Sequence, residues 1–125
     1  MTNNTSEEVL KRVTEFINSM DIDSFISLYE PDAIFIDESG ESFQGIDRIR
    51  EKMKTYIDMN GKSESRKTKV IITGNISLVY RDWMYEATRP DGTPINIGGT
   101  GIDVLRRQHN NTWIRVIDNP WGIKN

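Results

Sequence analysis

The stretch from Gly99 to Gly122, G-T-G-I-D-V-L-R-R-Q-H-N-N-T-W-I-R-V-I-D-N-P-W-G, predicts a β-hairpin. Residues 101–107 alternate in character as a strand does, so that successive side chains point to opposite faces of a sheet. Residues 113–118 are rich in β-branched and aromatic side chains, which favour a partner strand. The polar residues 109–112 between them suit a tight turn, because asparagine tolerates a positive φ.

Asp103 is the unusual residue of this hairpin. It shares a strand face with Leu105, although carboxylates are depleted in strands and costly to bury unpaired. Two explanations follow: this face borders a wet cavity, or Asp103 is paired with Arg115 or a backbone amide. A two-residue turn and a bulged turn differ by one residue in register, and this reverses the face of the second strand that meets Asp103. The sequence leaves both choices open.

The composition predicts one soluble globular domain over residues 1–125. Of its residues, 36% are hydrophobic and 28% are charged. The net charge of −3 argues against a nucleic-acid binder, because phosphate binding needs concentrated positive charge. The chain has no cysteine, which excludes disulfides and a thiol nucleophile. We expect a cytoplasmic protein that does not enter membranes, because there is no signal peptide and no apolar run of membrane length.

No metal or cofactor is predicted. The only histidine, His109, falls in the predicted turn, far from the aspartates that a Ser-His-Asp site would need. The glycines at 98–101 lack the lysine of a phosphate-binding loop and lead into a strand instead of a helix. The acidic side chains near residues 37–41 are of the kind that most often face solvent.

The rest of the chain predicts three helices and one early strand, followed by a run of strands. Thr5 and Glu8 have the spacing of a capping box before the first helix. The predicted helices span residues 6–19, 22–29 and 46–59, and the predicted strands span 33–37, 67–73, 76–88, 95–107 and 113–118. This order predicts an α+β fold with the helices on one face of a curved, mainly antiparallel sheet.

Several short motifs resemble the nuclear transport factor 2-like superfamily, and within it the SnoaL-like and ketosteroid-isomerase-like proteins. They are Asp21-Ile22-Asp23, L-Y-E-P-D-A at 28–33, Asp37, Phe43-x-Gly45 leading into Ile49-Arg50, and the final hairpin around Asp103. The resemblance covers nearly the whole chain and implies a single cone-shaped, cystatin-like domain with a pocket at its open end. It also implies a homodimer through the convex face of the sheet, where Ile102 and Val104 would otherwise be exposed.

The same resemblance implies two catalytic aspartates. Asp37 falls where ketosteroid isomerases keep their general base, and Asp103 falls where they keep a protonated acid that donates to the substrate oxyanion. The match fails on the first helix, where the isomerases have an oxyanion-binding tyrosine and this chain has residues 13–16, Val-Thr-Glu-Phe. Loss of one such donor typically costs about 10²–10³-fold in rate.

We therefore hold two hypotheses for function. The first is a cofactor-independent isomerase, cyclase or dehydratase that acts on a small apolar carbonyl compound, with Asp37 as general base. The second is a non-catalytic ligand-binding or dimerisation module of the same fold. In both, a small apolar organic molecule would occupy a pocket lined by Phe16, Tyr29, Tyr56, Trp83, Tyr85, Asn119 and Trp121.

Overall fold

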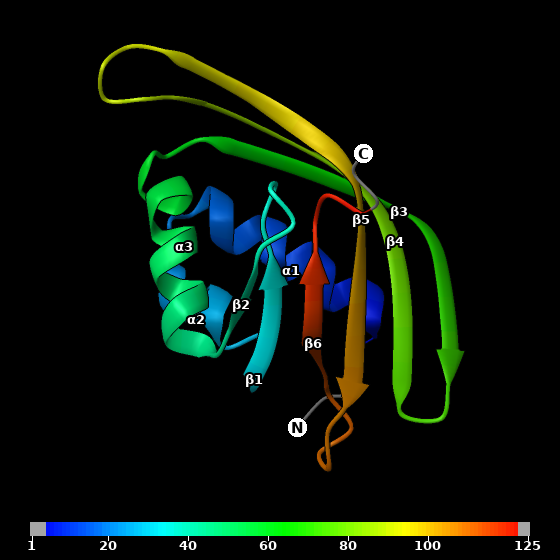
Figure 1. Cartoon of the computed structure of the whole chain (residues 1–125). Coiled ribbons are helices and arrows are strands. Elements are labelled where there is room, and N and C mark those ends of the chain that lie inside the picture. Colours follow the sequence, from blue (N-terminus) through cyan, green and yellow to red (C-terminus); the bar gives the residue numbers. More distant parts are fainter. Residues whose placement is uncertain (1–4, 123–125) are drawn as a thin grey trace.

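The computed structural model describes residues 5–122 and has three helices packed on one face of a curved six-stranded sheet (Figure 1). The predicted α+β architecture is confirmed. The strand order in the sheet is β2-β1-β6-β5-β4-β3. The elements are α1 (Ser6–Asn18), α2 (Ile22–Ile26), β1 (Tyr29–Ile36), β2 (Ser42–Gln44), α3 (Ile46–Asp58), β3 (Lys62–Thr73), β4 (Ile76–Thr88), β5 (Pro94–Arg107) and β6 (Trp113–Asn119).

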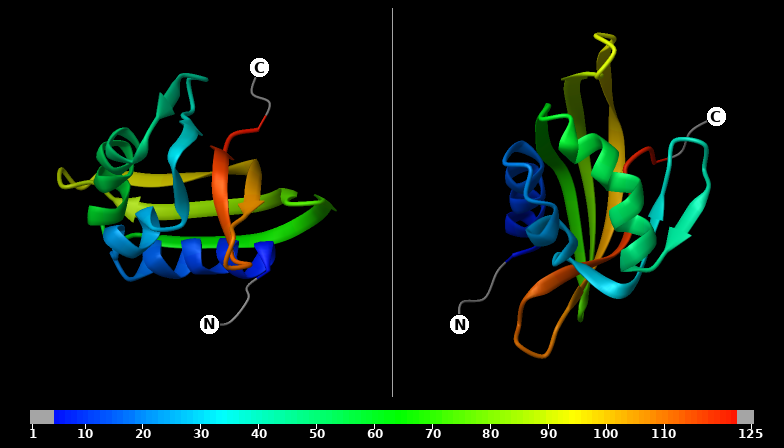
Figure 2. Two further views of the ribbon diagram at one scale, coloured as in Figure 1. Left: turned by 90° about the horizontal axis from the view of Figure 1, so that it is seen from below. Right: turned by 90° about the vertical axis from the view of Figure 1, so that its left-hand side faces the viewer.

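Helix α1 begins at the predicted capping box. The Glu8 amide donates to Thr5 Oγ1 at 3.1 Å, and the Thr5 amide donates to Glu8 Oε1 at 3.2 Å. These bonds satisfy two amides that the first turn would leave unpaired. The apolar stripe of the helix buries Val9, Leu10 and Val13 against the core, and Figure 2 shows the helix running along the β3 side of the sheet.

Helix α2 is shorter than predicted because the chain must enter the sheet. The sequence predicted a helix to residue 29, but it ends at Ile26, and Tyr29 begins β1 beside Arg115 of β6. Pro31 lies inside β1 and does not end a helix. Proline is tolerated there because it is exposed and falls where the pairing of β1 with β6 is irregular, between Tyr29 and Ile34.

The last four strands form an antiparallel meander, as predicted, while β1 pairs with β6 in parallel. The β3 strand begins five residues earlier than the predicted start at 67, because β4 offers it a partner along its whole length. The short strand β2 was not predicted and pairs with the end of β1. The β4–β5 hairpin curves past the rest of the sheet toward the end of α3 (Figure 1), so the sheet is strongly bent around the helices.

The β5–β6 hairpin has the bulged form of the two turns that the sequence allowed. Asn111 has φ of 63°, its amide donates to the Gln108 carbonyl at 3.0 Å, and the Gln108 amide donates to the Thr112 carbonyl at 2.7 Å. A second irregularity follows in β6: Leu105 pairs with Arg115, but Val104 pairs with Ile117. One residue of β6 is thus unpaired. This bulge turns Arg115 and Asp118, three residues apart, toward the same buried face.

Candidate functional site

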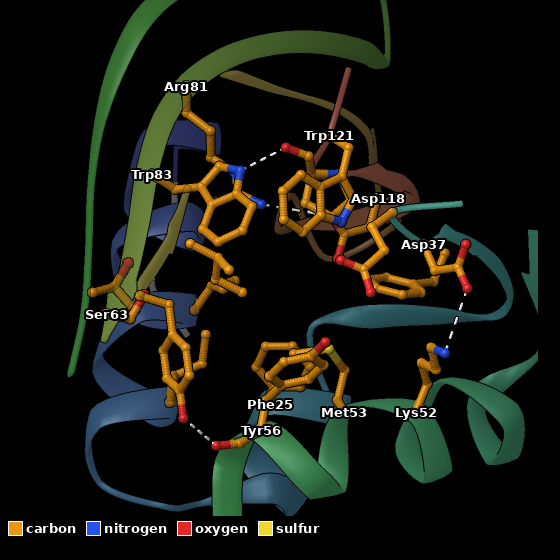
Figure 3. Close-up of a pocket in the computed structure, with 18 of the residues that line it drawn as sticks. Phe25, Asp37, Lys52, Met53, Tyr56, Ser63, Arg81, Trp83, Asp118 and Trp121 are labelled. Atoms are coloured by element: carbon orange, nitrogen blue, oxygen red, sulfur yellow. Dashed lines mark hydrogen bonds and ion pairs between the residues drawn. The ribbon is translucent and has the colours of Figure 1, made fainter. Parts of the chain in front are cut away.

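A cavity of about 90 Å³ lies between the concave face of the sheet and the three helices (Figure 3). This is room for several water molecules or one small ring. Its walls are mostly apolar, with Val13 and Ile17 from α1, Phe35 from β1 and Met53 from α3. Within residues 5–122, no helix is long and apolar enough to cross a membrane, and no three acidic or histidine side chains gather so that they could hold a metal ion.

Two aromatic pairs form the rim of this cavity. Trp83 and Trp121 meet edge to face with their ring centroids 5.0 Å apart, and Tyr56 and Tyr85 do so at 6.0 Å. Trp83 Nε1 donates to the Pro120 carbonyl at 2.5 Å, which fixes the chain after β6 against β4. Edge-to-face pairs hold both rings in place and leave their other surfaces available to a ligand. The chain after β6 therefore closes one side of the cavity.

The inner end of the cavity is a buried ionic cluster, made of Tyr29, Arg81, Asp103, Arg115 and Asp118. Arg81 Nε donates to Asp103 Oδ2 at 2.5 Å, and Arg115 Nη1 donates to Asp118 Oδ2 at 2.9 Å. The Tyr29 hydroxyl donates to the same Asp118 oxygen at 2.5 Å. Asp103 and Asp118 lie directly opposite on β5 and β6, an arrangement that needs cations because like charges opposite each other destabilise a sheet.

Arg115 also reaches Asp103, with Nη1 3.9 Å from Oδ1, and Arg81 Nη2 lies 3.5 Å from Asp118 Oδ1. Each carboxylate therefore faces both arginines. The four charges cancel within one buried site. Asp103 and Arg115 have no exposed side-chain surface, and the side chain of Asp118 is 4% exposed.

Burial affects the pKa values of the two aspartates differently. Loss of solvent raises the pKa of Asp103 to about 6, although Arg81 opposes this change. Burial also acts to raise the pKa of Asp118, but Arg115 and Arg81 together outweigh it and hold that pKa below its usual value. Burial raises the pKa of the Tyr29 hydroxyl well above its usual range, so it stays a donor to Asp118. Asp118 is thus the firmly ionised member of the pair.

The guanidinium of Arg115 is only partly satisfied. Its Nη1 contacts the aspartates, while its plane stacks on the Tyr29 ring, with Cζ 4.0 Å from the ring centroid. Among the residues that the structure describes, Nε and Nη2 of Arg115 have no hydrogen-bond partner, although both atoms are buried. Arg115, Arg81 and Asp118 all border the cavity, whereas Asp103 does not.

A second, more exposed acid–base pair borders the same cavity at a place that we call the mouth. Lys52 Nζ lies 3.4 Å from Asp37 Oδ2 (Figure 3). Asp37 Oδ1 accepts hydrogen bonds from the Ser39 hydroxyl, the Ser39 amide and the Glu41 amide at 2.6, 2.9 and 3.1 Å. These bonds, with that from the Ser39 hydroxyl first, lower the pKa of Asp37. Such a carboxylate is a weak base.

The predicted site residues separate into two groups. Asp37, Tyr56, Trp83, Tyr85 and Trp121 border the cavity. The others lie elsewhere: Phe16 packs against the hydrophobic core, Tyr29 lies in the ionic cluster, and the Asn119 amide donates to the Gly122 carbonyl.

Of the two explanations for Asp103, a wet cavity or a paired carboxylate, the structure shows the pairing. The idea that it lines an apolar cavity without a cationic partner is wrong, because the side chain lies behind the cavity against Arg81. The predicted partner, Arg115, is the more distant of its two arginines.

Sequence reasoning missed Arg81, Arg115 and Asp118 as cavity residues. A signal was available, because Arg81 and Arg115 are charged residues within predicted strands, just as Asp103 is. A buried charge needs a partner, so these three strand charges could have been paired with one another. Asp118 gave no such signal, since it ended the predicted strand, where acids are common.

The SnoaL-like domain family matches residues 10–116, most of the chain. No curated protein matches the sequence. Solved structures that share its fold include the following three. A nuclear transport factor 2-like superfamily protein from Salmonella enterica serovar Typhimurium has a TM-score of 0.78 at 22% identity and covers 95% of this chain and 89% of its own.

A ketosteroid isomerase-like protein from Erwinia carotovora atroseptica has a TM-score of 0.76 at 16% identity, covering 90% of this chain and 88% of its own. A nuclear transport factor 2-like protein with a cystatin-like fold, from Novosphingobium aromaticivorans, has a TM-score of 0.74 at 14% identity, covering 90% and 75%. At these identities the likeness shows the fold alone. The helices on a curved sheet and the family match agree, and the chain belongs to the SnoaL-like domain family.

Proposed function

We propose that this domain binds a small, largely apolar organic molecule in the cavity between the helices and the sheet. One observation carries the proposal: a cavity with apolar and aromatic walls ends at buried charged groups, Arg81, Arg115 and Asp118. Ligand sites combine these two features, because apolar walls supply affinity and a few fixed polar groups orient the ligand. The apolar body would pack against Trp83 and Trp121, with its polar end toward the ionic cluster.

A catalytic role for Asp37 is the second candidate function. Asp37 borders the same cavity as Arg81, so a bound molecule would lie between a carboxylate and a cation. Such a pair suits isomerisation, cyclisation or dehydration, in which the base takes a proton and the cation stabilises the resulting negative charge. The lowered pKa of Asp37 makes it a weak base, and this favours binding over catalysis.

The binding proposal is tested by titrating the protein with acetophenone, a neutral probe with a single aromatic ring, and following tryptophan fluorescence. We expect quenching with saturation in the wild type. Removal of one aromatic contact by Trp121→Ala should weaken binding about twofold to tenfold, since such a contact is worth roughly 0.5–1.5 kcal/mol.

The matched control is Trp113→Phe. Trp113 is as buried as a core residue and does not border the cavity, so this variant should bind like the wild type. Absence of saturable quenching, or equal weakening by both substitutions, would contradict the proposal.

We also propose that two copies associate through the convex face of the sheet. Ile71, Leu78, Val104 and Ile117 are neighbours across four strands and form an apolar row on that face. Ile71 is 45% exposed in the single chain. Burial of such a row in a symmetric contact would remove it from water.

Sedimentation at micromolar concentration should give twice the 14.4 kDa of one chain. Val104→Glu should shift the protein to the single-chain mass without unfolding it. A wild-type protein that sediments only as the single chain would rule out this dimer.

A further inference from the structure

The unpartnered edge of Arg115 indicates what the ligand of this cavity carries. Nε and Nη2 are neighbours on one edge of the guanidinium, while Nη1 points to Asp118 and Asp103. The Nε–Nη2 edge presents two parallel N–H groups, the arrangement that matches the two oxygens of a carboxylate. The same side chain has no exposed surface, so bulk water does not satisfy it.

Unpartnered buried donors are rare because each costs about 1–3 kcal/mol, and more on a charged group. The cavity that Arg115 borders is where an acceptor could lie. Stacking on the Tyr29 ring at 4.0 Å and on the Phe25 ring at 5.2 Å holds the guanidinium plane, so the two donors have a fixed direction. A fixed fork loses little entropy when it binds an anion.

The charges at the inner end favour an anion over a cation. Arg81 and Arg115 border the cavity with Asp118 as the only acid beside them, whereas Asp103 lies behind. The cluster is neutral as a whole, but both of its guanidinium groups border the cavity, whereas only one of its two carboxylates does. Asp118 Oδ1 lies 3.5 Å from Arg81 Nη2, so much of its charge is offset.

We propose that the ligand is a small monocarboxylic acid with an apolar body, bound by its carboxylate to the Nε–Nη2 edge of Arg115. This inference rests on the proposed binding function and adds the chemical class of the ligand. The volume of about 90 Å³ limits the body to a single ring or a short chain. The ring would lie toward Trp83 and Trp121, which stand across the cavity from Met53 and Tyr56 in Figure 3.

The test compares phenylacetate with phenylacetamide, which has the same size and shape but no charge. Both are titrated into the wild-type chain by calorimetry, with acetophenone as the reference ligand. We expect phenylacetate to bind at least about tenfold more tightly than phenylacetamide, since charge-assisted hydrogen bonds are roughly twice as strong as neutral ones.

Equal binding of acid and amide would overturn the carboxylate inference and leave the binding function in place. Failure of acetophenone and both other compounds to bind would overturn the binding function itself. Tighter binding of the acid supports both.

Arg115→Lys tests whether Arg115 binds the carboxylate, because lysine keeps the positive charge but lacks the two parallel N–H groups of the guanidinium. We expect the preference for the acid to fall to about threefold or less, while the surface variant Arg106→Lys keeps it in full, since Arg106 is half-exposed and paired with Glu30.

If Arg115→Lys does not fold, the NMR resonance of the Arg115 Nε–H in the wild type tests whether Arg115 binds the carboxylate. It should shift with phenylacetate and stay unchanged with phenylacetamide. The assignment of Arg115 would be overturned if its Nε–H resonance did not shift with phenylacetate. It would also be overturned if the lysine variant kept the full preference for phenylacetate over phenylacetamide.

Discussion

Two aspartate–cation pairs border the cavity, one in the buried inner cluster and one at the mouth, and their surroundings differ in exposure. At the inner end, Asp118 is 4% exposed and its partner Arg115 is fully buried. At the mouth, Asp37 is 11% exposed and Lys52 is 38% exposed. Water screens the pair at the mouth, whereas the inner pair keeps most of its electrostatic energy and its desolvation cost. Loss of one partner should therefore cost much more stability in the inner cluster than at the mouth.

The two ends also differ in where their partners come from. Asp37 is held by Ser39 and Glu41, which are two and four residues away in the same turn. Asp118 is held by Tyr29 from β1, at the other end of the sequence, as well as by Arg115. The mouth is thus a local structure, while the ionic cluster exists only when β1, β4, β5 and β6 have assembled.

The largest expected effect comes from Asp118→Asn. This change leaves Arg81 and Arg115 with one carboxylate in a buried site, and the loss of one partner of a buried pair costs about 3–5 kcal/mol. The folded pKa of Asp118 is lowered, so its contribution is present above the unfolded pKa of about 4 and is lost as the pH falls. The deficit in unfolding free energy should therefore be large at pH 7 and shrink in acid.

Denaturant unfolding between pH 3 and 7 measures this deficit. Asp23→Asn is the matched control, because Asp23 pairs with Arg50 at 2.7 Å but is 84% exposed. It should cost less than about 1 kcal/mol. Similar costs for the two variants at pH 7 would mean that the inner pair is not held as described.

Asp103→Asn should have a smaller effect at pH 7 and the opposite pH dependence. The folded pKa of Asp103 is about 6, above its unfolded value. Between about pH 4 and 6 the native state holds a proton that the unfolded state has released, so the wild type loses stability at this site as the pH rises. The variant lacks this loss. The deficit of Asp103→Asn in unfolding free energy, relative to the wild type, should be greatest near pH 4, decrease up to pH 6 and stay constant above pH 6.

Thermal melts of the two amide variants across this pH range give the comparison directly. A deficit of Asp103→Asn that grows from pH 4 to pH 7 would show that its pKa is lowered, and that Asp103 and Asp118 have equivalent roles.

The smallest effects are expected at the mouth. Asp37→Asn keeps the oxygen that accepts from Ser39 and Glu41 and loses only the charge that faces Lys52 at 3.4 Å. We expect a cost below about 1 kcal/mol. Because the pKa of Asp37 is lowered, this cost should be present at neutral pH and disappear in acid.

Lys52→Met should change stability by less than about 0.5 kcal/mol, because the exposed ammonium is screened. Denaturant unfolding of Asp37→Asn and Lys52→Met at pH 7 and pH 3 checks both predictions. A cost at the mouth as large as that of Asp118→Asn would remove the distinction between the two ends.

Local features of the chain were predictable because neighbouring residues decide them. The capping box at Thr5 and Glu8 fixed the start of α1, and the bounds of β4 at 76–88 followed from the turns on either side. The α+β order of helices and strands, and the family resemblance, were readable for the same reason. The end of α2 was not, since the competing interaction for Tyr29 lies in β6.

By itself, the sequence determined the elements, their order and the presence of charged residues within strands that need partners. Only the tertiary structure decided the pairing. The bulge between Arg115 and Ile117 turns Arg115 and Asp118 to one face, where strict alternation would place them on opposite faces. That bulge depends on how β6 fits between β1 and β5. Burial then fixes which aspartate stays ionised, because desolvation depends on all the surrounding strands. It also leaves Nε and Nη2 of Arg115 without a hydrogen-bond partner among the described residues.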